Sequence, residues 1–383
     1  MGEQTDGVRD GAPGPGPGDR AAAPRPWRER ATWAPLAALA VLVLGWGRDL
    51  PGAAVAVVGL CLAGAVLSAV HHAEVVAHRV GEPFGSLVLA VAVTVIEVGL
   101  IVMLMVSGGG AATYARDTVF AAVMITCNGV VGLSLLAATL RGRVAVFNAE
   151  GSGGALATVT TLAATTLVLP AFTTGTPGPE FTGAQLAFAA VASLSLYGLF
   201  VTMQTVRHRE YFLPVTTEGR PADPAAHAPP PTRAATGWSL GLLAAALVAV
   251  VGLAKLVSPA IESAVRAVGL PTAVVGVTIA LMVLLPETLA ALRAARGARV
   301  QTSLNLAYGS AIASIGLTVP TIALVSVWLP GPLILGLGPV HLVLLALTAV
   351  VSALTVVPGR ATLLQSGVHL LLFAAFLFLS FSP

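Results

Sequence analysis

The segment FGSLVLAVAVTVIEVGLIVMLMV, residues 84–106, is long and apolar enough to cross a lipid bilayer, yet it carries one charged residue, Glu97. A second segment, TAVVGVTIALMVLLPETLAAL at residues 272–292, also has a single charge, Glu287. An ionisable side chain at bilayer depth costs roughly 2.5–3.5 kcal/mol on insertion scales, so it normally faces an ion pathway or a partner. Two such carboxylates, one in each half of the chain, predict a cation site within the membrane.

The composition places most of the chain in a membrane. Of the 383 residues, 56% are apolar and only 10% are charged, and the mean hydropathy is +0.89, which is atypical of a soluble domain. A helix that spans about 30 Å of hydrocarbon needs about 20 apolar residues. Such runs predict an all-α polytopic membrane protein of about eleven transmembrane helices, at residues 33–48, 51–70, 84–106, 118–140, 153–172, 184–206, 238–257, 272–292, 303–329, 332–356 and 362–381.

The distribution of Lys and Arg predicts how this bundle is oriented. If the N-terminus is cytoplasmic, only Arg48, Arg116, Lys255 and Arg266 of the 20 Lys and Arg fall outside. Cytoplasmic loops carry such an excess of positive charge. We therefore expect a multi-pass protein of the plasma membrane with a cytoplasmic N-terminus and an external C-terminus. The net charge of +3 then reflects topology, and no basic patch suggests binding to nucleic acid.

Two polar stretches predict the domain organisation. Residues 1–32, rich in Gly, Pro, Ala and Arg, lack the apolar core of a signal peptide and predict a disordered cytoplasmic tail. Residues 207–237 predict a cytoplasmic linker. Between and after these stretches we expect a first transmembrane helix at 33–50, a five-helix repeat at 51–206 and a second five-helix repeat at 238–383.

The two halves share motifs in the same order. The pattern E-x6-G-x-P occurs at residues 74–83 and 262–271, and each copy precedes a lone membrane glutamate and then Asn-x3-Gly, at 128–132 and 305–309. Because five helices per repeat is an odd number, the second copy must be inserted upside down, and inverted repeats bind their substrate near the midplane, between broken helices. Glu74 and Glu262 lie at predicted membrane edges. They are interpreted either as gating or proton-relay residues or as solvated charges at helix ends.

Other oxygen-bearing groups accompany the two glutamates. Pro286, directly before Glu287, removes a backbone donor and frees a carbonyl within the membrane. Carboxylate, hydroxyl, amide and carbonyl oxygens form a hard ligand set that suits Ca²⁺ and leaves Na⁺ or K⁺ open. The predicted ligands are Glu97, Glu287, Asn128, Asn305, Thr94, Ser310 and Ser314. The last two belong to a polar face with Thr318 and Thr321 on the predicted helix 303–329, and this face would also serve helix packing.

Three further residues in the spans favour packing roles. His369, inside the last predicted span, would be able to relay protons, but a hydrogen-bonded packing histidine is the favoured interpretation. Cys61 and Cys127 form no metal-binding or disulfide pattern, so we interpret them as small buried apolar residues.

The stretches EVVAHRVGEPFGSLVLAVAVTVIEV (residues 74–98) and LLPETLAALRAARGARVQTSLNLAYGSAIASIGLTVP (residues 284–320) resemble the two signature regions of the calcium/proton antiporters of the cation/calcium exchanger superfamily, particularly the bacterial calcium (sodium, potassium)/proton branch. The resemblance covers about residues 50–380. It implies one helix plus two inverted sets of five, with the ion and the protons bound at Glu97 and Glu287. Many members carry Gly-Asn-x-x-Glu at both signatures, whereas this chain has VTVIE at 93–97 and VLLPE at 283–287, so strict calcium selectivity is not implied.

The charge of the predicted site leads to a prediction of exchange. Two ionised glutamates carry a charge of −2 that a low-dielectric gate opposes, whereas one Ca²⁺ or two protons neutralise it. We therefore expect Ca²⁺/H⁺ antiport, with Na⁺/H⁺ or K⁺/H⁺ antiport as the alternative and no cofactor beyond the transported ion. The sequence has no catalytic motif or nucleotide-binding loop that predicts an enzyme, and a passive cation channel would not need an inverted repeat.

Overall fold

The computed structural model of the protein describes residues 30–48, 51–81, 84–107, 112–213, 215, 231–271, 273–328 and 331–382. The predicted tail at 1–32 lies almost entirely outside these residues, and so does much of the predicted linker at 207–237.

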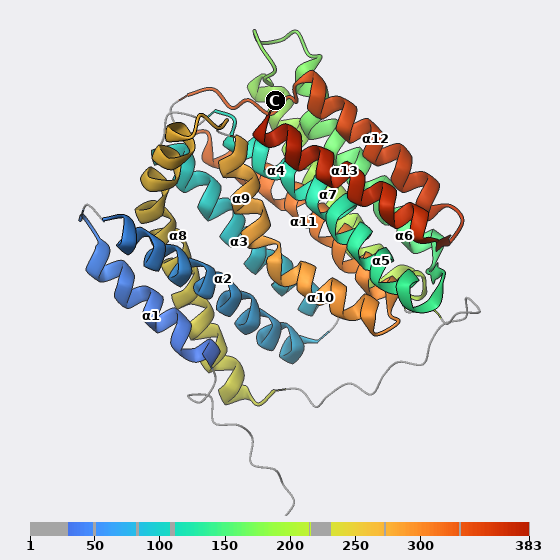
Figure 1. Ribbon diagram of the computed structural model, residues 1–383, viewed down its shortest axis with the longest axis horizontal. Coiled ribbons are helices and arrows are strands. Elements are labelled where there is room, and N and C mark those ends of the chain that lie inside the picture. Colours follow the sequence, from blue (N-terminus) through green and yellow to red (C-terminus); the bar gives the residue numbers. More distant parts are fainter. Residues whose placement is uncertain are drawn as a thin grey trace, which may run out of the picture.

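The described chain is folded almost entirely into helices (Figure 1). The α-helices are α1 Arg30–Gly45, α2 Gly52–Val80, α3 Phe84–Ser107, α4 Tyr114–Met124, α5 Val131–Gly142, α6 Ala149–Ala163, α7 Gly183–Thr202, α8 Arg233–Ala267, α9 Ala273–Val283, α10 Leu285–Arg296, α11 Val300–Val325, α12 Pro339–Val356 and α13 Leu363–Phe381. The π-helical turns are η2 Ile125–Val130, η3 Ala164–Val168 and η5 Met203–Arg207, and the 3₁₀ turns are η4 Leu169–Ala171 and η6 Arg209–Phe212. The strands β1 Ala145–Val146 and β2 Arg360–Ala361 pair antiparallel.

The helices confirm the prediction of an all-α polytopic membrane protein. Among the described residues, nine helices are long and apolar enough to cross a membrane, and the bent pair α9–α10 makes a tenth. The N-terminal helix α1 is apolar but only 16 residues long. Eleven spans are reached only if α1 is included, so the count of eleven stays a prediction.

The first helix of each predicted repeat is longer than its apolar run. The spans predicted at 51–70 and 238–257 continue to Val80 in α2 and to Ala267 in α8. Hydropathy detects the bilayer-facing part of a helix, whereas the helix itself ends where the backbone must leave helical dihedrals. Gly81 (φ 76°) and Gly269 (φ 71°) adopt left-handed conformations at these two ends, which glycine does at little cost. The glycine of E-x6-G-x-P is therefore a helix terminator in both halves.

The two halves have capping boxes and short strands at matching places in their helix order. A capping box of Thr182 and Gln185 begins α7, and another of Thr362 and Gln365 begins α13. The strand β1, before the fourth helix of the first half, pairs with β2, after the fourth helix of the second half. The reciprocal pairing joins residues 180 and 334. Because α12 separates residue 334 from β2, the two pairings lie at opposite ends of the bundle, as an inverted repeat requires.

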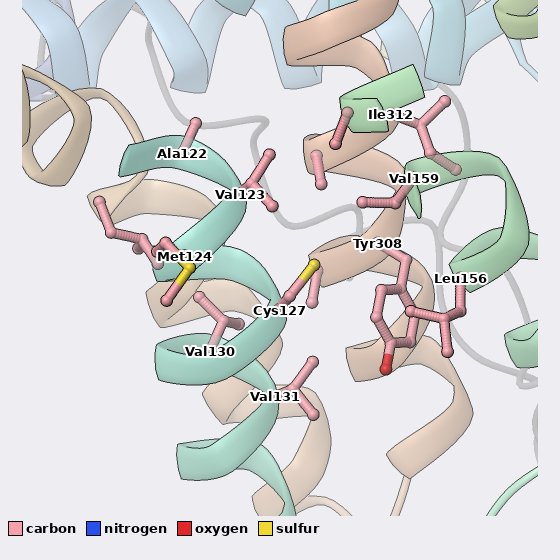
Figure 2. Packing of buried hydrophobic residues seen from close by; sticks show 14 of the residues in the cluster. Ala122, Val123, Met124, Cys127, Val130, Val131, Leu156, Val159, Tyr308 and Ile312 are labelled. Carbon is pink, nitrogen blue, oxygen red and sulfur yellow. The ribbon is translucent and has the colours of Figure 1, made fainter. Parts of the chain in front are cut away.

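Two large hydrophobic cores, with a small third cluster around Ile101 and Ile322, hold the bundle together. The smaller core joins α1, α2 and α8, which lie side by side along one flank (Figure 1), to one face of α3 and α9. The larger core is formed mainly by α4–α7 and α11–α13. Figure 2 shows part of it, where Cys127 of η2 points toward Tyr308 of α11 near Leu156 and Val159 of α6. Both cysteines are free; Cys127 is buried as predicted, whereas Cys61 is only partly buried. The helix α9 contributes residues to both cores and therefore lies between them.

One close approach between helices leads to a stability prediction. A Cβ at Gly276 of α9 would lie 3.2 Å from Cβ of Asp117 and 3.3 Å from the backbone of α4. We expect Gly276→Val to lower the free energy of unfolding by about 1–3 kcal/mol because helix backbone must move to admit the side chain. Thermal unfolding in detergent measures this effect. Gly241→Val, which meets no atom within 4 Å at its Cβ, is the control, and equal melting temperatures for both variants would contradict the prediction.

Candidate cation site

Glu97 lies near the middle of α3, which is continuous through this region. The side chain is only 5% exposed. The hydroxyl of Ser314, on α11 of the other half, donates a 2.7 Å hydrogen bond to Oε1 of Glu97. Thr318, one turn further along α11, also lies beside this carboxylate, and its buried Oγ1 makes no hydrogen bond within the described part of the chain. Hydroxyl groups of the second half thus reach a carboxylate of the first.

Glu287 lies at the break between α9 and α10, which are bent by 51° relative to each other. Leu284 is the N-cap of α10, and Pro286 fits in the first turn because N–H groups there have no acceptor within the helix. The Glu287 carboxylate interacts with its own backbone N–H, at the positive end of the α10 dipole. Its Oε2 is buried without a hydrogen-bond partner among the described residues. A buried carboxylate oxygen with free lone pairs is suited to accept a cation.

The two glutamates line one cavity of about 330 Å³, bounded by α3, α7, α10, α11 and the turn η5. The cavity wall includes six of the seven ligands predicted from the sequence, namely Thr94, Glu97, Glu287, Asn305, Ser310 and Ser314. The rest of the wall is largely apolar. A few polar groups in an apolar cavity is the usual character of a small-ligand site.

The cavity extends from the middle of the bundle toward one end. Its wall is formed by the N-terminal half of α3, the N-terminal half of α11 and the C-terminal part of α7, which point to the end predicted to face the cytoplasm. At the opposite end, α4 and α9 approach closely at Gly276. The glutamates are therefore approached from the predicted cytoplasmic side.

A third carboxylate, Glu74 of α2, lies outside the cavity wall. Glu74 and Glu97 both repel a negative charge on Glu287, and the side chain of Glu74 is exposed on the protein surface. Its counterpart Glu262 lies on α8, with its side chain outside the described residues. The gating or relay role of both residues stays a prediction.

The amide of Asn305 is already engaged at the cavity wall. Its Nδ2 donates to the carbonyl of Phe212 at 2.6 Å, and its Oδ1 accepts from Nε2 of Gln301 at 2.8 Å. These bonds tie α11 to the end of η6. The Oδ1 atom accepts one hydrogen bond and keeps a second lone pair, so this amide oxygen is still able to act as a ligand.

Asn128 does not lie with the two glutamates. It is fully buried in η2, does not line the cavity, and bonds instead to side chains of α12 and α13. It lies in the middle of the long helix formed by α4, η2 and α5, whereas Asn305 lies in the second turn of α11. The two Asn-x3-Gly motifs are therefore not equivalent in depth, and the predicted role of Asn128 as a ligand gains no support from its position.

The structure adds cavity residues that sequence reasoning missed. Tyr197 and Gln204, on α7 and η5, and Thr302 on α11 line the wall. Tyr197 and Gln204 are seven residues apart on one helical face, a weak signal that the sequence did contain. In the predicted polar face of α11, Ser310 and Ser314 line the cavity, whereas the hydroxyl of Thr321 donates to its own helix.

Comparison with known proteins confirms the resemblance drawn from the two signature stretches. Residues 50–206 and 238–382 match the family described as sodium/calcium exchanger protein. The chain is 49% identical over 323 residues to y4hA of Sinorhizobium fredii, covering 84% of this chain and 87% of that protein. It is 35% identical over 353 residues to the sodium-potassium/proton antiporter ChaA of Escherichia coli, covering 91% and 95%.

A solved structure shows the same fold. The structure of native YfkE matches with a TM-score of 0.68 at 16% identity, over 92% of this chain and all of that one. The chain therefore belongs to the sodium/calcium exchanger protein family, within the cation/calcium exchanger superfamily of antiporters.

Proposed function

We propose that the protein exchanges Ca²⁺ for protons across the membrane, with Glu97 and Glu287 as the sites that the cation and the protons share. The observation that carries this proposal is the single cavity lined by both glutamates, one from each half of the chain. Ca²⁺ prefers oxygen ligands, including carboxylates and neutral oxygens, and the cavity offers both. The names of ChaA and YfkE, a sodium-potassium/proton antiporter and a Ca²⁺/H⁺ antiporter protein, both include the proton as counter-ion.

The charge of the two glutamates supplies the coupling. When both are ionised, the empty site carries a charge of −2 in a region of low dielectric, where an unneutralised charge is strongly disfavoured. One Ca²⁺ or two protons neutralise the pair. The carrier therefore changes its access with a cation or with protons bound, and the empty ionised site stays on one side. Exchange follows without covalent chemistry, which is the work of a transporter and not of an enzyme.

Antiport of Na⁺ or K⁺ for protons is the second candidate. It is favoured by the 35% identity to the sodium-potassium/proton antiporter ChaA over most of both chains. It is also favoured by the absence of the signature amides next to Glu97 and Glu287, since fewer neutral ligands weaken the preference for a divalent ion. The same two glutamates would bind the monovalent cation.

The experiment that separates these candidates is ion flux in proteoliposomes with an imposed pH gradient. Purified protein is reconstituted into vesicles with an acidic interior, and we measure whether the outward proton gradient drives ⁴⁵Ca²⁺ uptake. We expect uptake that collapses when an ionophore dissipates the gradient. Uptake of Na⁺ or K⁺ with no movement of Ca²⁺ would select the second candidate, whereas no proton-coupled flux of any of the three would overturn both.

The site of action that fits this function is the plasma membrane. With the N-terminus in the cytoplasm and the C-terminus outside, the cavity opens toward the cytoplasm, and an inward proton gradient drives extrusion of the cation. The orientation rests on the excess of Lys and Arg in the predicted cytoplasmic segments.

A prediction concerns the hydroxyl that contacts Glu97. Ser314→Ala removes the 2.7 Å hydrogen bond to the carboxylate and one neutral oxygen from the cavity. A hydrogen bond to a charged group contributes about 1.5–3 kcal/mol, so we expect the cation KM to rise by about tenfold or more. Thr321→Val is the matched control, because the Thr321 hydroxyl binds only a carbonyl of its own helix. An unchanged KM for Ser314→Ala would remove Ser314 from the site.

A further inference from the structure

A buried chain of hydrogen bonds joins the two halves away from the cavity. Nε2 of His369 lies 3.1 Å from Oγ1 of Thr355, and Nδ1 of His369 lies 3.3 Å from Oδ1 of Asn128. Nδ2 of Asn128 then donates to Oγ1 of Thr348 at 2.9 Å. His369 and Asn128 are both fully buried. These four side chains come from η2 of the first half and from α12 and α13 of the second.

The donors and acceptors of this chain run in one direction. The Thr348 hydroxyl donates to the carbonyl of Leu344 at 2.8 Å, so its oxygen is free to accept from Asn128. The Asn128 carbonyl oxygen then faces His369, which must carry its proton on Nδ1, and Nε2 accepts from Thr355. Hydrogen bonds aligned in this way polarise one another in a buried environment. Every polar group of His369 and Asn128 thus has a role in one network.

The π-helical turn provides a further acceptor for His369. In a regular α-helix Val131 N–H would donate to Cys127, but here it donates to Thr126 and Asn128. His369 also interacts with the backbone carbonyl of Cys127, which the π turn frees. The imidazole of His369 therefore contacts the π turn twice, at the side chain of Asn128 and at the backbone carbonyl of Cys127.

Glycines in the same helix allow α13 to come this close. A Cβ at Gly132 would lie 2.9 Å from Leu370 and 3.1 Å from Cβ of His369, and a Cβ at Gly129 would lie 3.3 Å from Phe373. The Asn-x3-Gly motif at 128–132 thus combines a partner for His369 with the space that His369 needs.

From this geometry we infer that His369 and Asn128 are positioning residues that hold the π turn against α12 and α13 and, through it, set the place of Glu287. The link to the site is direct packing, because η2 contacts α10, the half-helix whose first turn contains Glu287. The inference rests on the proposed function of Glu287 in cation binding. Asn128 contributes to exchange by fixing the wall of the site and not as a cation ligand.

The test compares three variants on α13 in the proton-coupled flux assay. His369→Leu removes both hydrogen bonds, whereas His369→Asn keeps a donor in the place of Nδ1. Ser366→Ala, a buried residue whose hydroxyl binds only its own helix, is the matched control. We expect His369→Leu to raise the cation KM about tenfold, His369→Asn to restore it to within about threefold, and Ser366→Ala to leave it unchanged. Equal KM values for His369→Leu and the control would overturn the inference.

A double-mutant cycle gives a second readout. We expect His369→Leu and Asn128→Ala to be strongly non-additive, in KM and in thermal unfolding, because each removes the same network. Additive effects would overturn the inference, and so would a KM increase confined to Asn128→Ala, which would make Asn128 a ligand.

If His369→Leu does not fold, Thr355→Val breaks only the far end of the chain of hydrogen bonds and is expected to shift KM in the same direction. If the wild-type protein shows no proton-coupled flux, the proposed function fails, while non-additivity in unfolding still tests the network.

Discussion

Glu287→Gln is expected to reduce proton-coupled cation exchange by at least about a hundredfold. Gln keeps the size and hydrogen-bonding capacity of the side chain but removes its charge and its ability to bind a proton. Glu287 offers a buried carboxylate oxygen that has no partner among the described residues. Losing a direct ionic ligand in a low-dielectric site costs about 3 kcal/mol or more, which is a factor of more than a hundred at 1.36 kcal/mol per tenfold.

Glu97→Gln is expected to have an effect of the same size, because one remaining carboxylate cannot balance either a divalent cation or two protons. The measurement is flux in proteoliposomes with and without a pH gradient, at matched amounts of folded protein. Glu150→Gln is the control, since Glu150 is exposed in the first turn of α6, outside the cavity wall. Exchange that survives both central substitutions would show that the cation site lies elsewhere.

Gly309→Phe is expected to reduce exchange by about tenfold or more while leaving the fold intact. Gly309 lines the cavity, and a Cβ built there meets no atom within 4 Å. The aromatic side chain therefore has room to enter the cavity without moving its neighbours, and it excludes the cation from its path to the two glutamates. We therefore expect no large loss of stability, unlike at an overpacked core position, where added atoms are destabilising.

The control for this variant is Gly154→Phe on α6, which also meets no atom within 4 Å and does not line the cavity. Thermal unfolding of both variants should stay close to that of the wild type. A Gly309→Phe protein with wild-type flux would show that cations do not pass through this cavity.

The same position reports which side the cavity faces. Gly309→Cys, in a background where Cys61 and Cys127 are replaced by Ala, places a single thiol in the cavity wall. A membrane-impermeant thiol reagent should inhibit flux when it is added on the cytoplasmic side of vesicles and not from the other side. Inhibition from outside only would reverse the predicted orientation of the chain.

Much of the fold was readable from local sequence. Apolar runs predicted the helices that cross the membrane. The shared order of motifs predicted two repeats, which stay a prediction, and the structure has capping boxes and strand pairings at matching places in the two halves. Hydropathy predicted the ends of the helices less well than their presence. The apolar runs stopped about ten residues before the ends of α2 and α8 because polar side chains interrupt the run without interrupting the helix.

The candidate site divides in the same way. Glu97 and Glu287 stood out because the cost of a charge in an apolar segment is a local property, and the cavity brings both together. Asn128 stood out for its chemistry but bonds to the network of His369. Gln204 and Tyr197 line the cavity, and their spacing on one helical face was only a weak local signal.

The sequence by itself determined the membrane setting and singled out the two carboxylates, because hydrophobicity and charge act on each segment independently of its neighbours. Only the tertiary structure decided which neutral groups face those carboxylates. A hydroxyl or amide within the membrane must find a partner, and that partner lies on whichever helix packs against it. Ser314 meets Glu97 from the other half of the chain, whereas Asn128, on an equally apolar helix, is turned toward α13.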